Sequence, residues 1–153
     1  MYYNSGIDPA FFVMFFIIML VIGIGMLLMV IFYLLTLQRT LEAVSPENQK
    51  MPPGQVWMVF IPLFGIVWQF IMVNRIADSL KAEFQKRNVQ VNEDRPGAGI
   101  GIAYCVLNCC CVVPILNILA IIGYLVCWII YWVKISGYKR QLEQTRPVQT
   151  TGF

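Results

Sequence analysis

Residues 9–38 read PAFFVMFFIIMLVIGIGMLLMVIFYLLTLQ and contain no Asp, Glu, Lys or Arg. Two further stretches, residues 51–74 and 96–133, also lack charged side chains. A helix needs about 20 apolar residues to cross the hydrocarbon core of a bilayer, and each of the three stretches is longer than that. The sequence therefore predicts an integral membrane protein built from helices. The apolar run 10–35 also exceeds the roughly 7–15 residues of a signal peptide, so we expect it to be a retained first membrane helix.

The composition agrees with a membrane protein. Charged residues make up 12% of the 153 residues, whereas soluble domains contain roughly 25%. The length predicts a single domain, residues 1–153. The formal net charge of +3 suits contact with anionic lipids and is too small to indicate nucleic-acid binding. Because the chain has no histidine, the commonest proton shuttle and metal ligand is missing, and we expect no cofactor.

Turn residues divide the apolar stretches into four expected spans. Pro62 and Gly65 lie inside the second stretch, where a proline either kinks a helix or breaks it into a re-entrant pair. The last stretch would be about 57 Å long as one helix, so we expect it to fold back near Pro114 and Asn117. The predicted fold is an all-α bundle with four transmembrane helices. The expected spans are residues 10–37, 55–73, 97–113 and 115–133.

Residues 74–96 form a polar loop between the second and third spans, and its first part is amphipathic. Apolar side chains recur at helical spacing, and Glu83 and Arg87 form a favourable pair four residues apart. We expect an amphipathic cytoplasmic helix over residues 74–87, either continuing the second span or lying among the head groups. Residues 144–153 are expected to be disordered. The apolar face is Val73, Ile76, Ala77, Leu80 and Phe84, and the charged residues on the rest of the helix are Arg75, Asp78, Lys81, Glu83, Lys86 and Arg87.

The distribution of Lys and Arg sets the expected orientation. With four crossings and both termini in the cytoplasm, nine of the eleven basic residues lie inside, as the positive-inside rule favours. If the Pro62 segment is re-entrant instead, the N-terminus lies outside and all eleven lie inside. We prefer four crossings, and the alternative remains open.

Two groups of residues suggest helix contacts or chemistry. Small residues at Gly97, Gly99, Gly101 and Ala103 favour close packing on a neighbouring helix. Three adjacent cysteines, Cys109, Cys110 and Cys111, are weak candidates for Cu(I) or zinc, for thiol oxidation or for acylation. They lack a C-x-x-C pair and a histidine partner, so ordinary packing is the preferred interpretation.

The remaining polar and aromatic residues favour a structural role. Gln69, Asn108 and Asn117 either bond across helices or line a solute path. Trp57, Trp132 and Tyr138 are expected at the membrane interface. No ionisable side chain lies within a span, which disfavours an ion-coupled pump. No catalytic pattern is present, so we do not expect an enzyme.

Two segments resemble a known group of proteins. WMVFIPLFGIVWQFIMVNRIADSLKAEFQKRN (residues 57–88) and CWIIYWVKISGYKRQL (residues 127–142) are similar to small multi-pass membrane proteins of Bacteroidetes-type bacteria. The stretch RIADSLKAEF is the most specific part. The resemblance implies location in the bacterial cytoplasmic (inner) membrane and supplies no activity and no functional residues.

These observations lead to three functional hypotheses. The first is a non-catalytic scaffold or accessory subunit, whose partners are the bilayer and other membrane subunits or further copies of itself. The second is a small channel or neutral-solute transporter, motivated by the segments broken at Pro62 and Pro114. The third is a thiol- or metal-binding membrane protein. If the Pro62 segment is re-entrant, the channel hypothesis gains weight.

Overall fold

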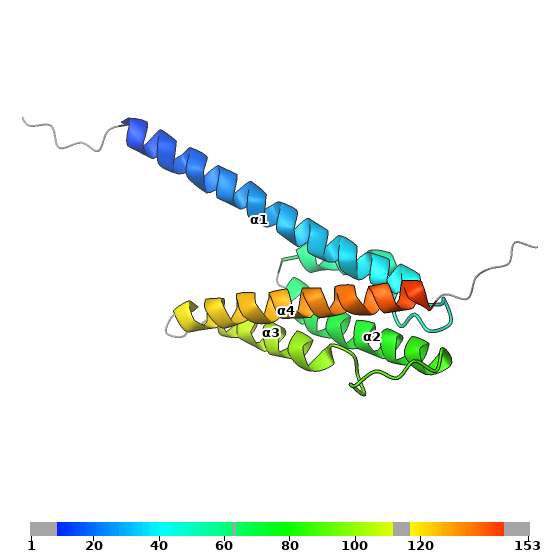
Figure 1. Ribbon diagram of the computed structural model, residues 1–153. Coiled ribbons are helices and arrows are strands. Elements are labelled where there is room, and N and C mark those ends of the chain that lie inside the picture. The colour runs from blue at the N-terminus through cyan, green and yellow to red at the C-terminus, as the bar shows by residue number, and fades with distance from the viewer. Residues whose placement is uncertain (1–8, 63, 112–116, 146–153) are drawn as a thin grey trace, which may run out of the picture. The chain divides into compact units, whose positions relative to one another are not determined.

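The computed structural model describes residues 9–62, 64–111 and 117–145, and these residues form helices joined by loops, without a strand (Figure 1). The prediction of an all-α bundle is confirmed. In chain order the elements are α1 (Pro9–Ala43), the 3-10 helix η1 (Pro53–Phe60), α2 (Phe64–Lys86), α3 (Ala98–Cys110) and α4 (Asn117–Gln144).

The chain divides into two units, residues 1–33 and residues 34–153. In the first unit the described residues belong to a single helix, and every residue from 9 to 29 is exposed. The second unit contains the hydrophobic core, in which α3 packs against α2 and α4, and η1 packs against α2. The single domain expected from the sequence stays a prediction. The division into two units does not by itself make two domains, because an exposed helical segment does not form a hydrophobic core of its own.

Two of the described helices are long and apolar enough to cross a membrane, α1 and residues 120–144 of α4. The structure therefore supports a helical bundle but not four such spans. The second half of α2 is too charged to qualify, and α3 has only 13 residues. Helix α4 continues past the expected end of the span at residue 133 to Gln144, the first residue of the expected disordered tail. Residues 146–153 of that tail lie outside the described part of the chain.

The expected second span is a hairpin rather than one helix. Helix η1 ends at Phe60, and α2 begins four residues later, after Pro62. The turn is close because Gly65 has no side chain: a Cβ atom there would lie 2.2 Å from the carbonyl oxygen of Val59. The indole Nε1 of Trp68 donates to the backbone oxygen of Gln55 at 2.9 Å, which holds η1 against the start of α2.

Because of this hairpin, the segments before and after it meet at one end of the second unit. The amide nitrogen of Lys50 donates to Ser79 Oγ at 2.8 Å, and Lys86 Nζ lies 3.0 Å from Glu47 Oε1. A full crossing by residues 55–73 would place residues 44–52 and the end of α2 on opposite sides. The observed contacts instead bring residues 44–52 and the end of α2 to the same end of the second unit.

The amphipathic pattern of α2 is confirmed with one exception. The predicted apolar face is buried in the core, and the helix is continuous with residues 64–73, so it extends the second segment. Glu83, expected among the solvated charges, is instead completely buried. It lies three residues after Leu80 and one before Phe84, so the helical period places it on the apolar face.

Candidate functional site: the polar end of the bundle

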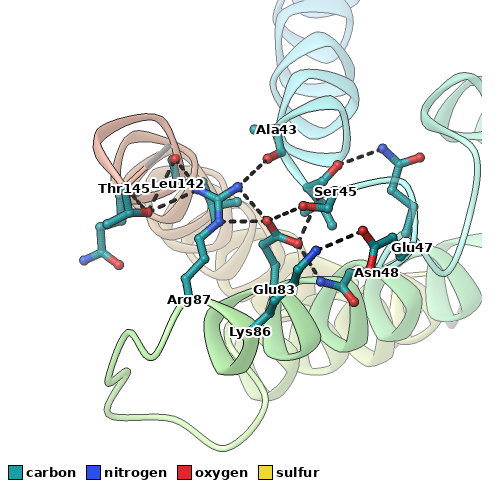
Figure 2. A network of polar contacts seen from close by, with 12 residues as sticks. Ala43, Ser45, Glu47, Asn48, Glu83, Lys86, Arg87, Leu142 and Thr145 are labelled. Carbon is teal, nitrogen blue, oxygen red and sulfur yellow. Dashed lines mark hydrogen bonds and ion pairs between the residues drawn. The ribbon is translucent and has the colours of Figure 1, made fainter. Parts of the chain in front are cut away.

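We use the term polar end for the part of the second unit formed by residues 39–52, 74–97 and 134–145. At its centre the buried carboxylate of Glu83 accepts four hydrogen bonds (Figure 2). Ser45 donates from its amide nitrogen at 3.1 Å and from Oγ at 2.8 Å. Asn48 Nδ2 donates at 2.7 Å and Arg87 Nε at 2.7 Å. The buried charge is thus fully compensated, as burial of a carboxylate requires.

The Arg87 guanidinium extends this network to two helix ends. It donates to the carbonyl oxygen of Leu142 at 2.6 Å, to Thr145 Oγ1 at 3.2 Å and to the carbonyl oxygen of Ala43 at 3.3 Å. The last carbonyl groups of a helix have no partner within the helix, and Arg87 supplies one for both α1 and α4. Figure 2 shows the guanidinium between these ends, with Glu83 beside it.

The network also determines the acidity of Glu83. Burial raises the pKa of a carboxyl group, because it penalises the charged form. The hydrogen bonds from Asn48, Ser45 and Arg87 favour the charged form, and together they outweigh burial, so the pKa of Glu83 lies below its ordinary value. Glu83 is therefore ionised at neutral pH.

A second carboxylate, Glu93, fixes the start of α3. It accepts a hydrogen bond from the amide nitrogen of Gly97 at 2.8 Å, an ion pair from Lys134 and a hydrogen bond from Tyr138 Oη at 3.2 Å. The bond from Gly97, followed by the contact with Lys134, lowers the pKa of Glu93. Gly97 has φ of +77°, a conformation that side chains other than glycine rarely adopt.

Of the small residues that the sequence singles out, two lie in tight contacts. A Cβ atom on Gly101 would lie 2.4 Å from Val73 Cγ1 and 2.8 Å from Tyr131 Cε2, and one on Gly97 would lie 3.2 Å from Ile135 Cδ1. Around Gly99 there is open space, and Ala103 is exposed. The structure thus places residues 97 and 101 at the contact of α3 with its neighbours and turns residues 99 and 103 away from it.

The predicted interface aromatics all donate hydrogen bonds within the second unit. Trp132 Nε1 donates to Thr36 Oγ1 at 3.0 Å, and Trp57 Nε1 donates to Gln38 Oε1 at 2.8 Å. Tyr138 donates to Glu93, as described above. These bonds join α1 to α4 and to η1.

The polar residues of the apolar segments are partly paired. Asn108 Nδ2 donates to Gln69 Oε1 at 2.9 Å, so the two predicted cross-helix residues bond to each other. Asn117 is the first residue of α4, but its side chain lies outside the described part of the structure, as does Pro114.

The cysteines do not form a ligand cluster among the described residues. Cys105 is buried, Cys109 is exposed, and Cys110, Cys111 and Cys127 are half-buried, and none of these five described cysteines forms a disulfide. No group of three His, Cys, Asp or Glu residues within residues 9–62, 64–111 and 117–145 has the proximity that a metal ion needs.

The described residues of the polar end line surface hollows, among them two that contain charged side chains in their lining. One, of about 310 Å³, lies between α2 and residues 89–96, where Lys81 is ion-paired to Asp94 at 2.7 Å. The other, of about 300 Å³, is lined by α1 and α4 residues. The sequence predicted the pair of Glu83 and Arg87, but it did not predict the hollows or the other partners of Glu83. The available signal was the acidic residue on the apolar face of α2, four residues before an arginine.

No protein-family model, no curated protein and no solved structure matches this chain. Its function is therefore argued from the contacts of the described residues.

Proposed function

We propose that this protein is a multi-pass membrane protein without catalytic activity, which acts as a scaffold or accessory subunit of a membrane assembly. The observation that carries the proposal is the contrast between its two kinds of surface. At the polar end, the charged groups of Glu83 and Arg87 form bonds that hold the segments together. Residues 9–29, by contrast, expose apolar side chains on all sides. A helix that is apolar all round needs apolar surroundings.

Residues 9–29 are long enough for a bilayer. At 1.5 Å per residue, residues 9–29 extend about 32 Å, which matches a hydrocarbon core of about 30 Å. Exposed side chains include Phe16 at 70% and Val21 at 63%. Lipid or a partner helix is the environment in which these side chains are stable.

The arrangement at the polar end supports a topology with the N-terminus outside. Residues 44–52 and 87–97 lie at the same end of the second unit, so all eleven Lys and Arg fall on one side if α1 and the α3–α4 pair cross. The positive-inside rule then makes that side cytoplasmic. We therefore propose that the hairpin of η1 and α2 is a re-entrant segment, which enters the membrane from the cytoplasmic side and returns to that side. It replaces the second of the four expected crossings.

The buried and half-buried carboxylates support a role without proton transfer. Both Glu83 and Glu93 are held ionised by hydrogen bonds to residues from other segments. General acids and bases instead have pKa values near the working pH. The bonding pattern is that of a structural clamp.

A channel or neutral-solute transporter is the second candidate, and the hairpin at Pro62 favours it. Broken segments within a membrane are where transporters bind substrates. Against this stands the bond between Gln69 and Asn108, which uses the polar side chains that could line a path. Flux of a neutral solute from proteoliposomes above that of empty liposomes would favour the channel.

The first test of the scaffold proposal is the state of the protein extracted from membranes in mild detergent. We expect a mass by light scattering above that of the monomer, or co-purified membrane subunits identified by mass spectrometry. Gly23 and Gly25 lack side chains, so a partner helix can approach α1 closely there. Gly23→Leu and Gly25→Leu meet open space within the chain and should weaken this association without changing the fold, whereas Val21→Leu, at an exposed position of the same helix, is the matched control. A wild-type protein that is monomeric and retains no partner would contradict the proposal.

The topology has its own test, by accessibility of single cysteines in a Cys-free background. Glu47 and Gln85 are exposed, so both positions are suitable probes. We expect cysteines at both positions to be labelled only from the cytoplasm, and one at Ser5 only from outside. Labelling of positions 47 and 85 from opposite sides of the membrane would contradict the re-entrant hairpin and favour four crossings.

A further inference from the structure

The hollow between α1 and α4 has an unusual charge pattern. It has a volume of about 300 Å³, the volume of about ten waters at roughly 30 Å³ each. This is enough for the polar head group of a lipid. The lining residues are Arg39, Glu42, Ala43, Lys139 and Glu143, so two cations and two carboxylates face one space.

These charges are only partly engaged. Lys139 Nζ and Glu143 Oε1 form a long ion pair of 3.4 Å between partly exposed groups, and Glu42 Oε1 accepts one hydrogen bond from Gln38 Nε2 at 2.9 Å. Within the described residues, no hydrogen bond or ion pair involves the Arg39 guanidinium, which is exposed. In the other hollow, by contrast, Lys81 is paired closely with Asp94. The Arg39 hollow therefore keeps charges available for a ligand.

The position of the hollow along the chain corresponds to the head-group layer. Arg39 follows directly after the uncharged stretch 9–38, and Lys139 lies six residues beyond the end of the uncharged stretch 96–133. Between them and the apolar part lies Trp132, bonded to Thr36. Tryptophan prefers the boundary between hydrocarbon and head groups. This step rests on the proposed membrane function.

We propose that this hollow binds the head group of a zwitterionic phospholipid, one that carries a phosphate and a primary ammonium group. The guanidinium of Arg39 and the ammonium of Lys139 bind the phosphate oxygens, as arginine and lysine commonly do. The carboxylates of Glu42 and Glu143 bind the lipid ammonium. Because the lining has equal numbers of each charge, it disfavours a head group with a net negative charge.

The test uses the delipidated full-length protein in detergent, with lipid binding measured by native mass spectrometry. The probes are dioleoyl phosphatidylethanolamine, dioleoyl phosphatidylglycerol and soluble glycerophosphoethanolamine. We expect the first to bind about tenfold more tightly than either of the others, a difference of about 1.4 kcal/mol. The phosphatidylglycerol arm tests the ammonium contacts, and the soluble arm tests whether the ligand is a membrane lipid.

Variants then assign the contacts. The double variant R39Q/K139Q should lose about tenfold in phosphatidylethanolamine affinity, while K86Q removes a cation outside the hollow and should change it less than twofold. E42Q/E143Q should abolish the preference over phosphatidylglycerol. Thermal unfolding of each variant, equal to that of the wild type, shows that the fold is retained.

Three results would overturn the lipid site: equal binding of both lipids by the wild type, equal binding of the soluble head group, or wild-type affinity in R39Q/K139Q. Its failure is separate from that of the proposed function. A wild-type protein that stays in membranes after alkaline extraction and associates with partners, but shows no lipid preference, refutes the lipid site alone. Release by alkaline extraction refutes the membrane function itself.

Discussion

The completely buried carboxylate of Glu83 accepts a hydrogen bond of 2.7 Å from Nε of Arg87, the residue that directly follows the end of α2. Most pairs of this spacing lie on helix surfaces and contribute a few tenths of a kcal/mol. Here the Arg87 side chain is only 12% exposed and also bonds to backbone oxygens near the ends of α1 and α4. The pair therefore connects three helices and the loop containing Ser45.

Replacing Glu83 with glutamine should destabilise the second unit. The substitution would keep the size of the side chain but would leave Arg87 without its counter-charge in a largely buried position. Breaking a buried pair in this way costs about 3 kcal/mol or more. The free energy of unfolding, measured by titration with a denaturing detergent, should fall by that amount.

The control for this variant is Lys86→Gln. It breaks the ion pair with Glu47, in which the Lys86 side chain is 47% exposed and the Glu47 side chain is 73% exposed. Exposed pairs contribute roughly 0–1 kcal/mol, so the free energy of unfolding should change little. Equal effects of the two substitutions would show that Glu83 does not have the special role assigned to it.

Stability should fall as the solution is acidified. The pKa values of Glu83 and Glu93 are lower in the folded protein than in the unfolded chain, where glutamate has a pKa of about 4.3. The unfolded state then binds more protons in acid, so the stabilisation is complete above about pH 4.3 and is lost as the pH falls through the folded values. Thermal unfolding midpoints between pH 7 and pH 3 measure this loss, and E83Q should reduce its slope. An unchanged slope in E83Q would contradict the assignment to this residue.

The sequence predicted α2 well because its apolar residues follow the helical period. The buried positions Val73, Ile76 and Leu80 were all on the predicted face. The sequence analysis assigned Glu83 to the charged side of the helix because its side chain is charged. Its position in the helical period, however, lies on the apolar face, and the residue is buried. Its partners Ser45 and Asn48 lie 35 or more residues away in the sequence, and no local pattern connects them.

The hairpin at Pro62 could be named from the sequence only as an alternative to a kink. A proline in an apolar run permits both, and the choice depends on a contact between η1 and α2. That contact is the approach of Gly65 to the backbone of Val59 and the bond from Trp68 to Gln55. The sequence shows that a glycine is present, but not which backbone atom approaches it.

Gly101→Ala should destabilise the packing of α3. The new Cβ atom would lie 2.4 Å from Val73 Cγ1 and 2.8 Å from Tyr131, both buried side chains with little room to move. Forcing an extra carbon into such a core costs about 1–3 kcal/mol. Gly99→Ala, in open space on the same helix, should instead be neutral or stabilise by up to about 1 kcal/mol. Detergent-denaturation curves of the two variants test the difference, and a loss of stability in both would contradict the packing described.

Gly65→Ala should open the hairpin of η1 and α2. The obstacle is a backbone oxygen, that of Val59, at 2.2 Å from the new Cβ atom, and a backbone atom cannot rotate away as a side chain can. We expect a loss of about 3 kcal/mol, at or above the upper range for overpacking. Gly54→Ala, in the same hairpin but with open space around it, is the matched control and should have no such effect. Because the Trp68 indole bonds to Gln55 only when the hairpin is closed, the tryptophan fluorescence of G65A should shift while that of G54A should not. An unchanged stability and spectrum in G65A would show that η1 does not fold back on α2, and the case for a re-entrant segment would fail with it.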